Sequence, residues 1–176
     1  MHRIHRNIGL VAAALALAFA GLVGCTTAAQ PPTPTAIPTP LPTASPTPAL
    51  PDEPYARILT ADGRQVIIRL EVADTAEERA IGLSKRSSLP ESVGMIFVYL
   101  NDHRSPFWMK DTWIPLSIAF LAADGRILEI QDMEPNTTET HQPAQMYRNA
   151  LEVNRGFFEK NGVNVGDSVE LRLGGK

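Results

Sequence analysis

The fold class is decided by residues 61–72, which read Ala-Asp-Gly-Arg-Gln-Val-Ile-Ile-Arg-Leu-Glu-Val. From Val66 to Val72 every second side chain is a branched apolar one, which is the period of a β-strand with one buried face. The pair Asp62-Gly63 precedes this run, and Tyr55–Thr60 forms another apolar run before it. An Asp-Gly pair between two such runs favours a tight antiparallel turn. We therefore expect a half-exposed β-hairpin here.

The same hairpin signal recurs at Asp124-Gly125, which separates Leu116–Ala122 from Ile127–Met133. Met95–Leu100 is apolar at both alternations and Leu116–Ala122 nearly so, which predicts central strands covered on both faces. Further short strands are expected at Phe107–Lys110, Arg148–Val153 and Ser168–Leu173. The fold class is therefore mainly β: a compact, single-domain β-sandwich or barrel-like fold with one or two short helices.

Two segments have helical signals. Thr75–Leu83 is preceded by Asp74 as the expected N-cap, with Glu77 three residues later as the other half of a capping box. Phe157–Asn161 predicts one or two turns that end at Gly162. Both are short, so strands should dominate the fold.

The N-terminus has the pattern of an export signal. Arg3 and Arg6 precede an apolar run, Ile8–Val23, that is short for a membrane-spanning helix. The run ends in Leu22-Val23-Gly24-Cys25, and small residues before a lone cysteine resemble the lipobox of bacterial lipoproteins. We expect a signal peptide at 1–24, lipidation at Cys25 and a cell-membrane anchor outside the cytoplasm, with the outer membrane as one location. An ordinary secreted protein cleaved near Ala20 or Ala29 is the alternative.

Residues 25–54 are expected to be a linker. They contain a dense run of prolines spaced by Thr, Ser and Ala, a composition that favours extended polyproline II over a packed core. The folded domain is then expected at 55–176, a length that suits one hydrophobic core.

The charge of the chain limits its partners. The net charge is −3, and it becomes more acidic if Arg3 and Arg6 leave with the signal peptide. Phosphate binding needs concentrated Lys and Arg, so nucleic acid is not an expected partner. The expected membrane contact is the lipid on Cys25 alone. No phosphate loop, dinucleotide fingerprint or zinc helix occurs in the sequence, and we expect neither a cofactor nor a metal.

The densest group of chemically useful residues is Phe107–Pro115. A strand here would put Phe107 and Met109 on one face, and Trp108 and Lys110 on the other. The binding interpretation takes Trp108, Lys110, Asp111, Thr112 and Trp113 as an aromatic wall with polar groups. The alternative is that both tryptophans fill the core and the polar residues stabilise a turn.

Arg79 is expected beside the apolar stripe that Ala76, Ala80 and Leu83 would form on the first helix. A buried guanidinium needs a carboxylate, and Glu152 lies between two apolar residues of a predicted strand. A structural ion pair of Arg79 with Glu152, or failing that with Asp111, is one interpretation. An anion subsite built from Arg79, Lys110 and Arg86 is the other.

Two enzymatic or metal-binding alternatives also follow from the residues. Glu78, Asp111 and Glu152 are weak catalytic candidates, because glycoside hydrolysis uses two carboxyl groups. Methionines together with His103 and His141 could suit a soft metal, although methionine normally fills apolar cores. A non-catalytic protein is the favoured interpretation.

The sequence resembles the domain of unknown function 192 family, also called uncharacterised protein family 0127. The resemblance covers Gln65 to Val169 and rests on several motifs, among them Glu78-Arg79-Ala80-Ile81-Gly82-Leu83, Gly94-Met95-Ile96-Phe97, Phe107-Trp108-Met109-Lys110, Ile114-Pro115-Leu116 and Leu151-Glu152-Val153. Ser84, Asp111 and Ser117 depart from the usual family residues. The resemblance implies a β-rich, often exported domain and no particular activity. We expect a module that binds an envelope glycan, peptide or partner protein, with an envelope hydrolase as the alternative.

Overall fold

The computed structural model describes residue 52 and residues 54–174. The expected signal peptide, Cys25 and nearly all of the expected linker lie outside the described residues. Within them the chain forms these elements in order: β1 (Tyr55–Leu59), β2 (Gln65–Ala73), α1 (Ala76–Ile81), β3 (Val93–His103), β4 (Phe107–Trp108), β5 (Leu116–Leu121), β6 (Ile127–Met133), β7 (Thr140–His141), β8 (Tyr147–Asn154), α2 (Phe157–Lys160) and β9 (Ser168–Arg172).

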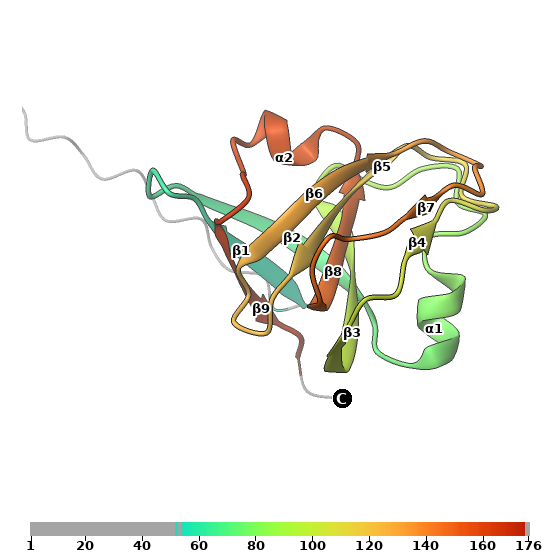
Figure 1. The fold of residues 1–176 in the computed structure, drawn as a ribbon. Helices are drawn as coiled ribbons and strands as arrows, with labels where there is room; N and C mark the ends of the chain where they lie inside the picture. Colours follow the sequence, from blue (N-terminus) through green and yellow to red (C-terminus); the bar gives the residue numbers. More distant parts are fainter. Residues whose placement is uncertain (1–51, 53, 175–176) are drawn as a thin grey trace, which may run out of the picture. The chain divides into compact units, whose positions relative to one another are not determined.

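Seven of these strands form one curled sheet in the order β6-β5-β8-β3-β2-β1-β9 (Figure 1). Both expected hairpins are present, β1 with β2 and β5 with β6, each antiparallel. Gly63 and Gly125 have φ angles of 83° and 86°, which only glycine adopts without strain. The sequence therefore located both turns correctly. The parallel pairing of β2 with β3 was not expected; α1 lies in the connection between them.

The curled sheet closes part of the way into a barrel. The amide of Ile127 on β6 donates to the Asp167 carbonyl at 2.9 Å, just before β9. The amide of Val169 on β9 donates to the Gly125 carbonyl at the same distance. The two end strands thus meet at one end, and the predicted mainly β fold with two short helices is confirmed.

Two apolar clusters lie on opposite faces of the central strands. The inner cluster fills the curl and includes Ile96, Ala119, Leu151 and Phe158 of α2. The outer cluster includes Met95, Ile118 and Ala150, and is covered by residues from the segments after α1 and after β4, among them Leu83, Leu89, Met109 and Ile114. β5 is therefore covered on both faces, as expected from its apolar run. β3 is covered in the same way only over residues 94–97, and the expectation was wrong at Leu100, which is 91% exposed.

α1 begins one residue later than expected. Its N-cap is Thr75, whose side chain accepts from the Glu78 amide at 3.1 Å, and the Glu78 carboxylate in turn accepts from the Thr75 amide at 3.0 Å. The expected pair of Asp74 and Glu77 was wrong by one position, because Asp74 and Thr75 are both good capping residues. No residue of α1 is buried, so the expected apolar stripe on this helix was also wrong.

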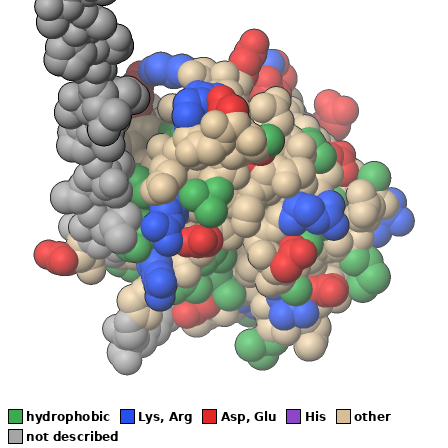
Figure 2. Space-filling model, turned by 90° about the vertical axis from the view of Figure 1, so that its left-hand side faces the viewer, with side chains coloured by type: hydrophobic (Ala, Val, Ile, Leu, Met, Phe, Trp, Pro, Cys, Tyr) green, Lys and Arg blue, Asp and Glu red, His purple; other side chains and the backbone are tan. Residues whose placement is uncertain are grey.

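The surface carries mixed charge. Figure 2 shows acidic and basic side chains interspersed on one face, with no patch of a single sign. In the part of the chain that the structure describes, no helix is long and apolar enough to cross a membrane.

Candidate functional site

A narrow cleft lies between α1 and β4 and ends against β8. Its walls include Arg79 and Gly82 from the first helix and the turn that follows, and Trp108, Lys110 and Thr112 from β4 and its continuation. Glu152 of β8 also lines it, and the cavity measures about 40 Å³. We call this the α1–β4 cleft. Its volume is on the order of one water molecule's share of liquid, so it accepts one small group and no whole sugar ring or side chain.

Glu152 faces the outer apolar cluster from the middle of the sheet. Met95 of β3 is its partner on one side and Ile118 of β5 on the other. The Glu152 residue is only 4% exposed. This burial raises the pKa of its carboxyl group to about 8. The group is therefore mainly a neutral acid at pH 7, with one O–H donor as well as acceptor oxygens.

The lack of a partner separates Glu152 from most other buried polar residues. Five polar or charged residues are buried in the described part of the chain: Thr60, Thr112, Ser117, Glu152 and Asp167. The Thr60 and Ser117 hydroxyls donate to carboxylates, and Asp167 accepts from two backbone amides. Among the described residues, Thr112 and Glu152 have no side-chain hydrogen bond, and both line the α1–β4 cleft. Buried polar groups normally have a partner, so these two are suited to bonds with a ligand.

Arg79 attaches α1 to β3. Its Nη1 atom donates to the Asp74 carbonyl at 2.6 Å and to the Val98 carbonyl at 2.9 Å. Its guanidinium carbon lies 4.6 Å from the ring centroid of Tyr99, within the range of a cation–π contact. The structure contains no ion pair between Arg79 and Glu152 within its described residues. The expected pair was wrong because backbone carbonyls and an aromatic ring hold the guanidinium instead.

Trp108 and Lys110 form the β4 side of the cleft. The Lys110 Nζ atom lies 5.6 Å from the centroid of the Trp108 ring. Trp108 is 56% exposed and Trp113 is 57% exposed. Neither tryptophan fills the core, so the alternative interpretation was wrong on this point. Phe107 and the buried Met109 face inward, which agrees with the expected alternation. Trp113 does not line the cleft.

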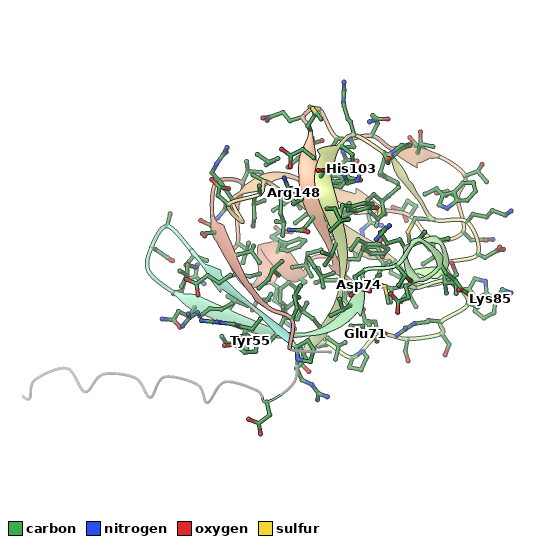
Figure 3. All side chains as sticks on the ribbon, turned by 90° about the horizontal axis from the view of Figure 1, so that it is seen from below. Tyr55, Glu71, Asp74, Lys85, His103 and Arg148 are labelled. Atoms are coloured by element: carbon green, nitrogen blue, oxygen red, sulfur yellow. The ribbon has the colours of Figure 1, made fainter. Side chains whose placement is uncertain are left out.

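Three other predicted site residues lie outside the cleft. Glu78 is occupied by the capping box, and Asp111 is an exposed turn residue with a φ of 58°. Arg86 pairs with Glu71 through two bonds of 2.6 and 2.5 Å, and this contact raises the pKa of Arg86. Glu71 and Asp74, labelled in Figure 3, mark the end of β2 from which the chain enters α1. The structure therefore brings Arg79, Trp108, Lys110, Thr112 and Glu152 together, and leaves Glu78, Arg86, Asp111 and Trp113 apart.

The residues that depart from the usual family pattern lie in different parts of the fold. Ser117 of β5 pairs with Val153, whereas the neighbouring Ile118 pairs with Glu152. Because adjacent residues of a strand face opposite ways, Ser117 lies on the other side of the sheet from the cleft. Ser84, in contrast, lines the cleft.

Several lining residues were not identified from the sequence. Ile81, Ser84, Phe97 and Phe107 all contribute to the cleft. Gly82 has a φ of 51°, and a Cβ atom there would lie 3.3 Å from the Phe97 ring. The sequence feature that could have located the cleft was Glu152, a carboxylate within an otherwise apolar strand. The residues opposite it come from distant segments and could not be identified without the fold.

Two larger hollows include polar side chains that already bind each other. One of about 340 Å³ includes Lys160 and Glu91, which bind each other at 3.0 Å. Another of about 400 Å³ includes Ser117 and Asp132, joined at 2.5 Å. Groups that already have partners have less to gain from a ligand, which makes these hollows weaker candidates. No group of three or more His, Cys, Asp or Glu side chains that could hold a metal ion occurs in residues 52 and 54–174.

Comparisons with known proteins agree on the fold. The crystal structure of a candidate transcription regulator from Sinorhizobium meliloti 1021 is similar, with a TM-score of 0.66 and 30% identity, over 67% of this chain and 92% of that one. A protein of unknown function from Novosphingobium aromaticivorans has a TM-score of 0.63 and 32% identity, over 66% of this chain and 83% of that one. The search of curated proteins finds no match. The model of DUF192, described as "Uncharacterized ACR", matches residues 57–171, and the chain therefore belongs to this family.

Proposed function

We propose that this protein is a lipid-anchored, extracytoplasmic binding module that engages an envelope glycan through the α1–β4 cleft. One observation carries the proposal: the half-exposed Trp108 stands at the cleft that ends at the buried, unpartnered Glu152. A sugar ring has apolar C–H faces that can lie against an indole, and polar substituents that can enter a small polar cleft.

The side chains in the cleft favour a glycan over a peptide or a protein surface. Arg79, Lys110 and Thr112 provide side-chain donors within a space that admits one substituent. Recognition of an extended peptide relies instead on a row of backbone hydrogen bonds along a strand edge. A large protein interface buries far more surface than this cleft provides.

Binding is favoured over hydrolysis because Glu152 is the only carboxylate among the residues that line the cleft. Glycoside hydrolysis by the usual route needs a second carboxyl group across the scissile bond. Glu78 and Asp111, the other two acids considered, lie outside the cleft. We do not carry over the role named for the Sinorhizobium meliloti protein, because this chain has a net charge of −3 and a sequence with an export signal.

The location rests on the N-terminal sequence. Arg3, Arg6, the apolar run and Cys25 have the order of a lipoprotein signal. Mass spectrometry of the mature protein should find an acylated Cys25 as its first residue. A Cys25→Ser variant should be released from membranes into the soluble fraction. A free thiol at Cys25 in a soluble cytosolic product would contradict the proposed location.

The binding function is tested with a matched pair of tryptophan variants. The full-length chain, purified in detergent, is titrated with soluble cell-wall saccharides, and binding is measured by calorimetry. Trp108→Ala should lose at least about tenfold in affinity, which is within the range of an interface hot spot. Trp113→Ala is the control, because Trp113 has nearly the same exposure but does not line the cleft. Equal effects of both substitutions, or no binding by the unchanged chain, would contradict the proposal.

A further inference from the structure

The chemistry of the α1–β4 cleft indicates which substituent it takes. Two cationic side chains, Arg79 and Lys110, line it together with the buried Thr112 and Glu152. Arg79 uses Nη1 for its two backbone bonds, and a guanidinium has further N–H donors. A space of about 40 Å³ whose lining includes two cations suits a small anionic group with several acceptor positions.

The floor of the cleft is consistent with an anion. Arg79 from α1 and Lys110 from the segment after β4 line the same cleft as Glu152. Tyr99 of β3 interacts with Glu152 electrostatically. The neighbours of Glu152 across the sheet, Met95 and Ile118, do not titrate. Burial raises the pKa of Glu152 to about 8 and also raises the pKa of Tyr99. At neutral pH the floor is therefore an uncharged O–H donor, which does not repel an anion.

Resting on the proposed function, we propose that the cleft is a carboxylate subsite that selects acidic sugars. The sugar ring lies against Trp108, and its carboxylate enters between Arg79 and Lys110 to accept a hydrogen bond from Glu152. Thr112 offers a further hydroxyl donor at the same place. A carboxylate is small and planar and accepts several charge-assisted bonds, whereas a neutral hydroxyl leaves both cations without a counter-charge.

Related sugars with and without a carboxylate test the subsite. The full-length chain in detergent is titrated with N-acetylmuramic acid against N-acetylglucosamine, and with glucuronic acid against glucose. The acidic member of each pair should bind at least about tenfold more tightly. The first pair carries a lactyl ether acid and the second a uronic acid, so the pair with the larger difference identifies the source of the carboxylate.

Three variants test which residues produce the preference for acidic sugars. Lys110→Gln should reduce the preference for the acidic sugar to within about twofold, because it removes one of the two cations. Lys160→Gln is the control: it removes the same charge from α2, where Lys160 pairs with Glu91. Glu152→Gln keeps a donor of similar size without an ionisable proton. Its affinity should stay constant from pH 7 to 9, whereas the unchanged chain should bind about tenfold more weakly at pH 9 as Glu152 ionises.

The outcomes separate the two proposals. Equal binding of acidic and neutral sugars that still depends on Trp108 would overturn the carboxylate subsite and leave the glycan-binding function in place. Tighter binding of glucose 6-phosphate than of glucuronic acid would also overturn it. An acid preference that survives Lys110→Gln would place the carboxylate elsewhere. Failure of every saccharide to bind the unchanged chain would contradict the proposed function itself.

Discussion

Neighbouring side chains of β8 lie in opposite kinds of surroundings. Leu151 is fully buried in the inner cluster among other apolar side chains. Glu152, one residue later, faces the outer cluster and the α1–β4 cleft with no hydrogen-bond partner among the described residues. The inner face of the strand is built for stability. The outer face retains a polar group whose burial costs stability, and such a cost is commonly found at functional sites.

The largest effect should come from the inner face. Leu151→Ala should lower the free energy of unfolding by about 3 kcal/mol, because it leaves a cavity in a core closed on both sides. Urea unfolding of the full-length chain measures this change. The substitution should leave the affinity for acidic sugars within about twofold at temperatures where the variant is folded. A loss below about 1 kcal/mol would show that the inner cluster is loosely packed.

The next effect concerns Glu152 on the outer face and is measured as a pH dependence of the free energy of unfolding. The folded chain keeps the proton of Glu152 up to a pKa of about 8, whereas the unfolded chain loses it near 4.5. Between these values the folded state binds more protons, so the free energy of unfolding falls as pH rises and levels off above about 8. Relative to Glu152→Gln, the unchanged chain should therefore lose about 3 kcal/mol between pH 6 and pH 9.

The difference in unfolding free energy between the unchanged chain and Glu152→Gln separates the contribution of Glu152 from those of all other titrating groups. Urea unfolding at pH 4, 6, 8 and 9 provides the measurement. A constant difference across this range would mean that Glu152 is hydrated and charged in the folded state. The cleft would then be wider than the structure indicates.

A smaller effect should come from the side chain that attaches α1 to the sheet. Arg79→Ala removes bonds to the Asp74 and Val98 carbonyls and the contact with Tyr99, and should cost about 2 kcal/mol. Lys110→Ala should change stability by less than about 0.5 kcal/mol, because Lys110 is exposed and its ammonium group lies over the exposed Trp108 ring. Thermal unfolding compares the two. Equal costs would remove the distinction between a residue that holds the fold and one that is available to a ligand.

The strands could be predicted from the sequence because their signals are local. The Asp-Gly pairs at 62–63 and 124–125 and the apolar run of β5 each identify an element without knowledge of its neighbours. The cleft could be predicted only in part. Trp108 and Lys110 were identified from their alternation and Glu152 from its apolar neighbours, but their grouping with Arg79 depends on the crossover from β2 to β3.

The wrong predictions for Arg79 and Arg86 also result from tertiary contacts that the sequence does not reveal. The Arg79–Glu152 pair was expected because two charges in apolar segments usually meet, yet the sequence contains no information on the backbone carbonyls that occupy Arg79. Arg86 was assigned to the anion subsite for its charge alone, and its partner Glu71 lies on a strand 15 positions earlier. Pairings of this kind are set by tertiary contacts, which local patterns do not encode.

A further small effect concerns that Arg86–Glu71 pair, whose two side chains bind each other, in contrast to Glu152. Both side chains are about one third exposed, so a double-mutant cycle with Arg86→Gln and Glu71→Gln should give a coupling of about 0.5–1 kcal/mol that weakens in salt. Neither substitution should change the affinity for acidic sugars, since neither residue lines the cleft. A coupling that is unaffected by salt would indicate that the pair is desolvated. A loss of sugar affinity in Arg86→Gln would extend the subsite beyond the α1–β4 cleft and restore the three-cation arrangement first expected from the sequence.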